Sequence, residues 1–219
     1  LISPFPMDLA VKQIFASSAA AAGYDFHKLM IPFRCVAADI VNKKPFVLRK
    51  GDLSSAVRAS MTYPFLFKPI IVDSTLLFDG GLYNNFPWDV MAKDFNPGFI
   101  IGSKCSGNAA EPDTEDILSQ LENMLRVETD YTIPQEKGVL IDILLPGVSI
   151  MDFNKVDEIY RVGYFNTLRY ISGIKSAIKR RTTQKEMLKK RMDFRTKTLP
   201  LRFADVHIPG SNLNDSEKK

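Results

Sequence analysis

The sequence predicts an α/β fold, with helices layered on both sides of a mostly parallel central sheet (α/β/α). Two observations lead to this prediction. Short apolar runs alternate along the chain with segments of helical spacing, which is the pattern of α/β proteins. The run 33–41 is almost entirely apolar, as expected of a strand covered on both faces in a parallel sheet. With 219 residues, 45% of them hydrophobic, the chain is long enough to bury one sizeable core.

The first predicted helix covers residues 8–22, which are rich in alanine. Helical spacing places Leu9, Ile14 and Phe15 on one face of it. Gly23 is a suitable residue to end it, because glycine accepts the left-handed conformation at a helix C-terminus.

Two shorter helices follow. One is predicted to start at Ser54 or Ser55, whose hydroxyl groups suit an N-cap, and to run through Met61. Pro64 must end it, because the residue before a proline disfavours helical geometry. The other helix has Pro87 in its first turn and runs to about Phe95.

Strands are expected at the short apolar runs between these helices. The run 46–48 is predicted to pair with 33–41 after a turn, and 70–72 and 75–78 to form a hairpin across two residues. The run 98–102 is predicted to be another short buried strand.

The C-terminal half is predicted to hold a surface loop at 103–113, a helix capped by Thr114, a strand at 139–145 and a long helix from near Asn154. The apolar face of the first of these helices comprises Ile117, Leu118, Leu121, Met124 and Leu125. The inward face of the second comprises Val156, Ile159, Tyr160, Leu168, Ile171 and Ile174.

Composition excludes several classes of protein. No apolar run approaches the roughly 18 residues that span a bilayer as a helix. Two cysteines are too few for a disulfide framework, and Cys35 is interpreted as a small core residue. His27 and His207 lie far apart with no Cys/His spacing for zinc, so no metal or other cofactor is expected.

The chain opens without a signal peptide or initiator Met, which we interpret as an interior point of a longer protein.

The positive charge is concentrated in residues 175–197. This segment carries ten Lys and Arg against Glu186 and Asp193, a net charge of +8, whereas the whole chain carries only +4. Three interpretations stay open: a solvated helix and linker, peripheral contact with an anionic membrane surface, and nucleic-acid binding. The last is disfavoured, because aromatic residues that would stack on bases are scarce in the segment, so no nucleic-acid partner is expected.

The most informative motif is the turn Asp79-Gly80-Gly81, followed by Asn84 and Asn85. By itself Asp-Gly-Gly is a common tight turn. Here it follows an Arg-Ala-Ser helix, an aromatic–proline stretch and a hairpin, and it precedes a helix opened by Asn-Asn-Phe-Pro. This context favours Asp79 as a catalytic carboxylate beside a groove at the edge of the sheet. The two asparagines either fix the loop by hydrogen bonds or are turn-forming residues without a role in the site.

This order of motifs resembles the patatin-like phospholipase family, over about residues 1–179. The similar segments are the strand 31–39, the helix 58–60, the loop 64–69 and the helix 157–164. The resemblance implies that Asp79 pairs with the serine of a Gly-x-Ser-x-Gly motif and that this dyad cleaves acyl esters of lipids. Gly80 and Gly81 would let the backbone bend sharply and leave room for the substrate beside Asp79.

The serine half of that dyad is not found in these residues. Gly147-Val148-Ser149 and Gly210-Ser211 do not fit the motif, and the glycine-rich oxyanion segment of the family is also absent. A carboxylate can activate a serine without a histidine, but only when that serine is within hydrogen-bond reach. We therefore expect the serine in a segment outside this chain, and the chain alone to be inactive. The serines in the matched region are interpreted as caps or helix surface: Ser3, Ser17, Ser18 and Ser60.

The main hypothesis is thus a lipid acyl hydrolase acting on a lipid or phospholipid ester. The alternative is a non-catalytic lipid-binding or interaction module on the same fold. Strands of the fold that the chain lacks would leave an apolar sheet edge, which we expect another chain to cover.

Three segments are expected: the C-terminal portion of a hydrolase domain at 1–179, a basic helix or linker at 180–198, and the start of a second module or a tail at 199–219. Residues 199–210 resemble a polypeptide-transport-associated module, which some bacterial patatin-like proteins carry before an outer-membrane barrel. That resemblance implies the bacterial cell envelope, with the cytoplasm as the alternative location.

Overall fold

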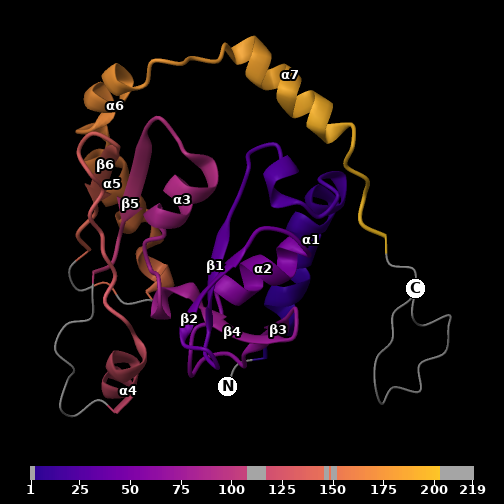
Figure 1. The fold of residues 1–219 in the computed structure, drawn as a ribbon, viewed down its shortest axis with the longest axis vertical. Coiled ribbons are helices and arrows are strands. Elements are labelled where there is room, and N and C mark those ends of the chain that lie inside the picture. The colour runs from indigo at the N-terminus through magenta and orange to yellow at the C-terminus, as the bar shows by residue number, and fades with distance from the viewer. Residues whose placement is uncertain (1–2, 108–116, 146–147, 149–151, 203–219) are drawn as a thin grey trace.

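The computed structural model describes residues 3–107, 117–145, 148 and 152–202. Its elements form two groups that lie side by side (Figure 1). One group is made by residues 5–82 and the other by residues 88–177. The helix α7 (Gln184–Arg195) follows both groups and lies at one end of the long axis.

The first group is built on a four-stranded sheet with the strand order β2-β1-β4-β3. Its strands are β1 (Cys35–Asp39), β2 (Lys44–Leu48), β3 (Ile70–Val72) and β4 (Thr75–Asp79). The predicted pairing of 46–48 with the 33–41 strand and the predicted hairpin of 70–72 with 75–78 are both confirmed. The two residues between β3 and β4, Asp73 and Ser74, both have positive φ, which suits a tight two-residue turn between antiparallel strands.

The direction of the strands in this sheet differs from the prediction. All five residues of β1 are buried, as the apolar run indicated, yet β1 runs antiparallel to both β2 and β4. The short turn from β1 to β2 can only reverse the chain, whereas a parallel neighbour needs a crossover of a dozen or more residues. Burial on both faces reports what covers a sheet, and it does not decide the direction of the strands.

Two helices cover this sheet. The helix α2 (Leu53–Ser60) packs against β1, β3 and β4, and α1 (Phe5–Ala21) packs against α2. Gly23 follows α1 with φ +61°, as predicted for a residue that ends a helix. The buried core between these elements comprises Ala19, Phe26, Cys35, Ala37, Leu48, Leu53, Ala56, Ala59 and Leu77.

Two details of these helices correct the prediction. The N-cap of α2 is Asp52, whose carboxylate accepts hydrogen bonds from the backbone N–H groups of Ser54 and Ser55. A carboxylate two residues before Ser54 thus replaces the predicted serine cap. In α1, Ile14 is 65% exposed, and the helix instead buries Val11 and Ala19.

The second group contains the parallel pairing that the sequence predicted. Its strands β5 (Ile100–Lys104) and β6 (Gly138–Asp142) run parallel in a two-stranded sheet. The helices of this group are α3 (Trp88–Phe95), α4 (Ile117–Leu125), α5 (Val156–Leu168) and α6 (Ile171–Ala177). The mixture of helices, antiparallel strands and a parallel pair confirms the α/β class, with parallel pairing confined to β5 and β6 among the described strands.

Several apolar faces of this group are exposed. The helix expected from Asn154 is broken at Arg169-Tyr170 into α5 and α6, and of its predicted inward face only Ile174 is buried. The exposed apolar side chains of α4 and α5 include Ile117, Leu121, Met124, Leu125, Val156, Tyr160 and Leu168. Helical spacing identifies an apolar face, but burial also needs a partner surface. Thr114 and residues 108–113 lie outside the described residues.

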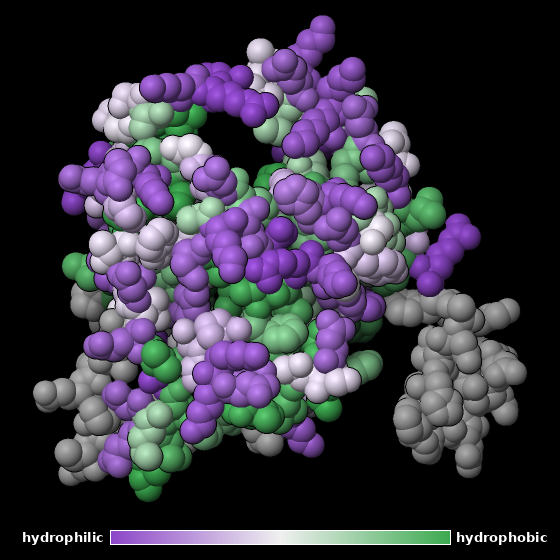
Figure 2. Space-filling view, in the orientation of Figure 1, coloured by the Kyte–Doolittle hydropathy of each residue, from purple (hydrophilic) through white to green (hydrophobic). Residues whose placement is uncertain are grey.

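The basic segment forms the predicted helix. Thr183 and Glu186 make a reciprocal capping box at the start of α7, which explains why the helix begins there. No residue of α7 is buried, and hydrophilic side chains predominate at this end of the molecule (Figure 2). In the part of the chain that the structure describes, none of the helices combines the length and apolar character of a membrane span.

Candidate active site

Asp79 lies where β4 leaves the sheet. It is the last residue of that strand, and the chain continues directly into a short 3₁₀ helix, Gly80–Leu82. The backbone N–H of Asp79 donates to the carbonyl oxygen of Thr62 (2.9 Å). The N–H of Gly81 donates to Asp79 Oδ1 (2.8 Å). Both the backbone and one carboxylate oxygen are thus held in place, and the described residues make no hydrogen bond to Asp79 Oδ2.

Close packing, and not an unusual backbone angle, explains the two glycines. Neither has positive φ, so the reason is not the left-handed conformation. A Cβ atom on Gly80 would overlap the Val36 carbonyl group of β1, at 2.7 Å from its carbon. A Cβ atom on Gly81 would lie 2.8 Å from Asn85 Oδ1 and 3.1 Å from Asp79 Oδ1. Gly80 thus lets the turn rest on β1, and Gly81 leaves the space around the carboxylate open.

A cavity of about 290 Å³ opens beside Asp79. It is lined by Tyr63, Pro64, Asp79, Gly81, Leu82, Asn85, Ser106 and Arg126. The prediction that Asp79 lies beside a concavity is confirmed, although β4 is an inner strand of its sheet and Asp79 is reached from the strand's end. This size is at the lower end for a small-molecule site.

The electrostatics of Asp79 favour a carboxylate that accepts a proton. Burial raises its pKa above the usual value, and the Gly81 N–H and the positive charge of Arg126 oppose the rise only in part. A raised pKa makes the carboxylate a stronger base than an exposed aspartate. The arrangement therefore suits proton abstraction from a group placed in the cavity.

The two asparagines differ in what they hold together. The Asn85 side-chain NH₂ donates to Tyr131 Oη (2.9 Å) and to Ser106 Oγ (3.1 Å), which joins the turn to two distant segments. The Asn84 side-chain NH₂ donates to the exposed Asp89 (3.0 Å) at the start of α3. Both therefore hold the loop by hydrogen bonds, and Asn85 also lines the cavity.

The structure brings two further residues to the cavity that sequence reasoning did not select. Ser106 and Arg126 lie 27 and 47 positions after Asp79, in segments without a motif. Ser106 Oγ is bound by Asn85 and makes no hydrogen bond to Asp79 within the described residues, so it is not placed as the nucleophile. The nearby Cys35 is part of the core as predicted, and burial raises the pKa of its thiol, which keeps it neutral.

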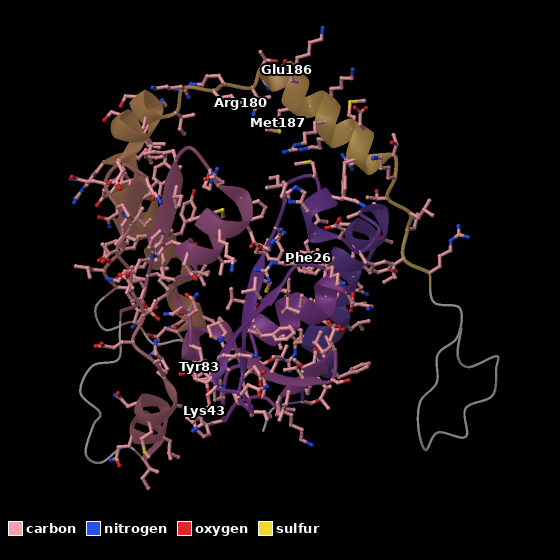
Figure 3. All side chains as sticks on the ribbon, viewed as in Figure 1. Phe26, Lys43, Tyr83, Arg180, Glu186 and Met187 are labelled. Carbon is pink, nitrogen blue, oxygen red and sulfur yellow. The ribbon has the colours of Figure 1, made fainter. Side chains whose placement is uncertain are left out.

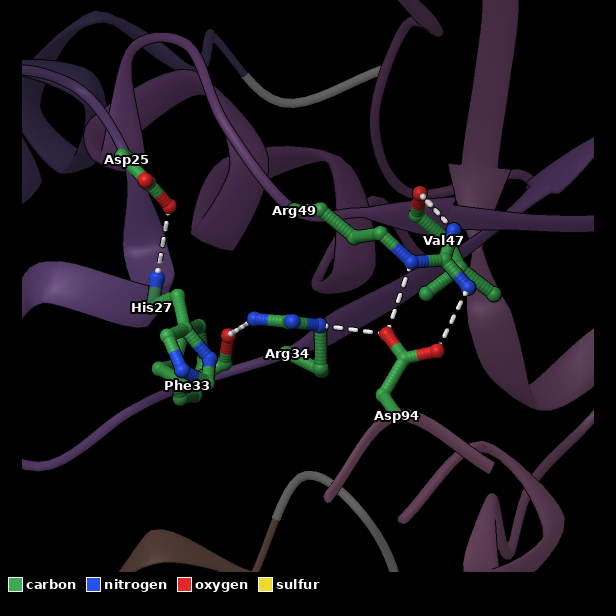
Figure 4. A network of polar contacts seen from close by, with 7 residues as sticks. All are labelled: Asp25, His27, Phe33, Arg34, Val47, Arg49 and Asp94. Carbon is green, nitrogen blue, oxygen red and sulfur yellow. Dashed lines mark hydrogen bonds and ion pairs between the residues drawn. The ribbon is translucent and has the colours of Figure 1, made fainter. Parts of the chain in front are cut away.

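A second carboxylate, Asp94 on α3, joins the two groups of elements (Figure 4). Its Oδ2 accepts hydrogen bonds from Arg34 Nε (2.5 Å) and Arg49 Nε (2.7 Å), and its Oδ1 accepts one from Arg49 Nη2 (3.1 Å). The two arginines lower the pKa of Asp94 to about 2. The Arg34 guanidinium also lies over the ring of Phe95, 4.6 Å from its centre. The His27 ring stacks on the same Phe95 ring, with 6.0 Å between the ring centres.

Residues 11–92 match the family model described as patatin-like phospholipase. The matched range contains Asp79, both glycines and both asparagines. It supports the resemblance to this family and covers the four-stranded sheet and the turn that carries the site.

Curated proteins from bacteria, a fungus and the mouse are similar to parts of this chain. An uncharacterised NTE family protein of Mycobacterium tuberculosis is 44% identical over 62 residues, or 28% of this chain. The lysophospholipase nte1 of Aspergillus fumigatus is 25% identical over 67% of the chain. The mouse patatin-like phospholipase domain-containing protein 6 is 28% identical over 62% of it. The chain spans only 11–12% of the length of these relatives.

Proposed function

We propose that this chain supplies the catalytic base of a patatin-like lipid acyl hydrolase, with Asp79 as that base. The observation that carries the proposal is the position of Asp79: it lies within the family-matched range, at the wall of a cavity, with one carboxylate oxygen held and the other not hydrogen-bonded by described residues. The names of the fungal and mouse relatives, a lysophospholipase and a patatin-like phospholipase, support a lipid ester as the substrate.

In this proposal, Asp79 Oδ2 accepts the hydroxyl proton of a serine as its oxygen attacks the ester carbonyl carbon. The proton then passes to the alkoxide of the leaving alcohol as the ester bond breaks, which leaves an acyl-serine. Water attacks the acyl-serine, gives its proton to Asp79, and releases the fatty acid, while the serine recovers its hydrogen. The Gly81 N–H orients the carboxylate through Oδ1, and burial raises its basicity.

The serine and the oxyanion hole belong, in this proposal, to a segment outside these 219 residues, since no Gly-x-Ser-x-Gly occurs among them. The intact protein, in which this chain is joined to that segment, is the catalyst, and the chain alone is inactive. No cofactor is required by this chemistry. Residues 1–179 form part of the hydrolase domain.

The test is hydrolysis of a short-chain nitrophenyl ester by the intact protein. Asp79→Asn should lower kcat by about 10²–10⁴-fold, because an amide cannot take the serine proton. Asp73→Asn is the matched control, since Asp73 is an exposed carboxylate at the opposite end of the β3–β4 hairpin. Unchanged turnover in Asp79→Asn would show that Asp79 is not the base.

The alternative, a non-catalytic lipid-binding or interaction module, makes the opposite prediction. In that case, the intact protein would bind lipid vesicles but hydrolyse neither nitrophenyl esters nor lysophospholipids, and Asp79→Asn would leave binding unchanged. The raised pKa of Asp79 favours the hydrolase, because burial of a carboxylate beside a cavity has no evident use in such a module.

The basic segment 175–197 is proposed to contact an anionic membrane surface, at about 1 kcal/mol per basic residue near the surface. Its exposure in α7 supports this. Figure 3 places Arg180 and Met187 at the opposite end of the long axis from Tyr83, which is near the site. The contact would therefore tether the protein and would not deliver substrate to Asp79. Contact of another chain with an exposed apolar sheet edge stays a prediction.

A further inference from the structure

Arg58 in the last turn of α2 is a buried cation that the proposed reaction does not use. Only 4% of its side chain is exposed, and it is not among the residues that line the Asp79 cavity. A buried charge is costly unless partners satisfy it. Arg58 Nε donates to Asp8 Oδ1 of α1 (2.7 Å), and Arg58 Nη1 donates to Thr62 Oγ1. The guanidinium also lies over the ring of Phe67, 5.1 Å from its centre. Arg58 therefore ties the end of α2 to α1 and to the loop that follows.

Thr62 is the next link, two residues after the end of α2, and it is fully buried. Its hydroxyl accepts the bond from Arg58 Nη1 and donates to the Arg58 carbonyl oxygen (2.8 Å). Its backbone N–H donates to the Ala59 carbonyl oxygen (3.1 Å). The side chain and the backbone thus both hold Thr62 against the last turn of α2.

The carbonyl group of Thr62 holds the backbone of the proposed base. Its oxygen accepts a hydrogen bond from the N–H of Asp79 (2.9 Å). The strand β3 pairs with β4 only as far as Leu77, so it does not supply a partner at Asp79. The Thr62 carbonyl provides the acceptor instead, as a backbone N–H in a folded protein requires. A continuous series of contacts therefore runs from Arg58 through Thr62 to the backbone of Asp79.

We infer that Arg58 and Thr62 are positioning residues, which set the place of the Asp79 carboxylate relative to the serine that it serves. This inference rests on the proposed function, because it concerns the base of that reaction. Proton transfer needs the two oxygens within about 2.6–3.2 Å, and a misplacement of about 1 Å can lower a rate about 10²-fold. The Thr62 hydroxyl fixes the carbonyl group that binds Asp79, so loss of the hydroxyl should displace the base.

The first test is Thr62→Val in the intact protein, which keeps the branched shape and removes both bonds of the hydroxyl. On a nitrophenyl ester, kcat should fall about tenfold or more and KM should change less than about threefold, because the base is displaced and substrate binding is not. Thr62→Ser keeps the hydroxyl, so its kcat should lie within about threefold of wild type.

Thr167→Val is the matched control for this pair of variants. Thr167 Oγ1 donates to the carbonyl oxygen four residues earlier (2.8 Å), as Thr62 does, but in α5. Its kcat should equal that of wild type. A wild-type kcat in Thr62→Val, or a loss that Thr62→Ser shows equally, would overturn the inference.

Two further variants separate positioning from stability. Asp8→Asn removes the charge partner of Arg58 but leaves Thr62 bound, so it should lower the melting temperature and change kcat less than about threefold. Arg58→Lys keeps the charge but loses the fork that holds Asp8 and Thr62 together, so kcat should fall about as far as in Thr62→Val. Each kcat is measured at a temperature where every variant is folded. A kcat that follows the loss of stability across all of them would overturn the inference, because Arg58 and Thr62 would then have a structural role only.

Hydrogen–deuterium exchange of the Asp79 amide distinguishes this inference from the proposed function, because it needs no turnover. With exchange resolved to single residues in the intact protein, that amide should exchange about tenfold or more faster in Thr62→Val than in wild type, and at the wild-type rate in Thr167→Val. This result can hold even where Asp79→Asn shows no catalytic defect, an outcome that refutes the proposed function alone. Wild-type protection of the Asp79 amide in Thr62→Val would overturn the positioning role, even where Asp79→Asn abolishes turnover.

Discussion

Asp79 and Asp94 are both aspartates at the end of a regular element, yet their surroundings give them opposite properties. Asp94 accepts three hydrogen bonds from two arginines, which lower its pKa to about 2. Among the residues that the structure describes, Asp79 accepts one hydrogen bond, from the Gly81 N–H, and burial raises its pKa. A carboxylate whose oxygens are satisfied by fixed cations is a structural link. A half-buried carboxylate beside a cavity, with one oxygen that no described residue hydrogen-bonds, is available for chemistry.

The two residues also affect stability in opposite directions. Asp94 is stabilised as an anion in the fold, so its ion pairs stabilise the protein wherever the carboxylate is ionised. Asp79 is less favourable as an anion in the fold than in the unfolded chain, so its ionisation costs stability. The ionised Asp79 therefore lowers the free energy of unfolding, whereas the ionised Asp94 in the Arg34–Asp94–Arg49 cluster raises it.

The largest expected effect on stability concerns Gly80, whose close approach to β1 fixes the turn that carries Asp79. Gly80→Ala should lower the free energy of unfolding of the intact protein by about 3 kcal/mol, because the added Cβ overlaps the Val36 carbonyl group and a backbone atom cannot move aside cheaply. Gly98→Ala is the control, since no atom lies within 4 Å of its added Cβ. Denaturant unfolding measures both, and equal stability of the two variants would contradict the close approach of the turn to β1.

The next largest effect on stability is expected from the loss of the ion pairs that Asp94 makes with Arg34 and Arg49. Asp94→Asn should lower the free energy of unfolding by about 2 kcal/mol, because it leaves Arg34 and Arg49 without their charged partner. Ester turnover at a temperature where the variant is folded should stay close to wild type. A loss of turnover in the folded variant would show that the two carboxylates are not separate in function.

The pH dependence of that loss follows from the lowered pKa of Asp94. Its folded pKa of about 2 is below the unfolded value of about 3.9, so its contribution is complete above about pH 4 and disappears as the pH falls toward 2. Thermal melts of wild type and Asp94→Asn should therefore differ at neutral pH and converge in acid. A constant difference down to pH 2 would assign the stabilisation to something other than the ionised carboxylate.

The smallest effect concerns the stability of Asp79→Asn. The raised pKa means that the cost of ionisation is present above the folded pKa and absent below the unfolded one. At pH 7, the amide removes this cost and can still accept the Gly81 hydrogen bond, so stability should rise slightly, by less than the loss in Asp94→Asn. Thermal melts at pH 7 measure the change. A clear loss of stability would make Asp79 a structural residue like Asp94.

Local features of the fold were predictable because neighbouring residues specify them. The hairpin of β3 and β4, the end of α1 just before Gly23 and the helix that follows Pro87 all depend on turn or cap residues next to the element. The direction of the sheet was not predictable from the burial of β1, because the same apolar run serves a parallel or an antiparallel strand. The apolar face of α4 shows the same limit, since spacing cannot say whether a partner covers it.

The sequence by itself determined the α/β class, the turn at Asp79 and its likeness to a known family, because these depend on the order and local spacing of residues. Only the tertiary structure decided what each carboxylate contacts. Asp94 meets Arg34 and Arg49, and Asp79 meets the charge of Arg126, across 45 to 60 positions of the chain. Electrostatic environment depends on distance in space and on exclusion of water, and no local pattern of residues encodes either.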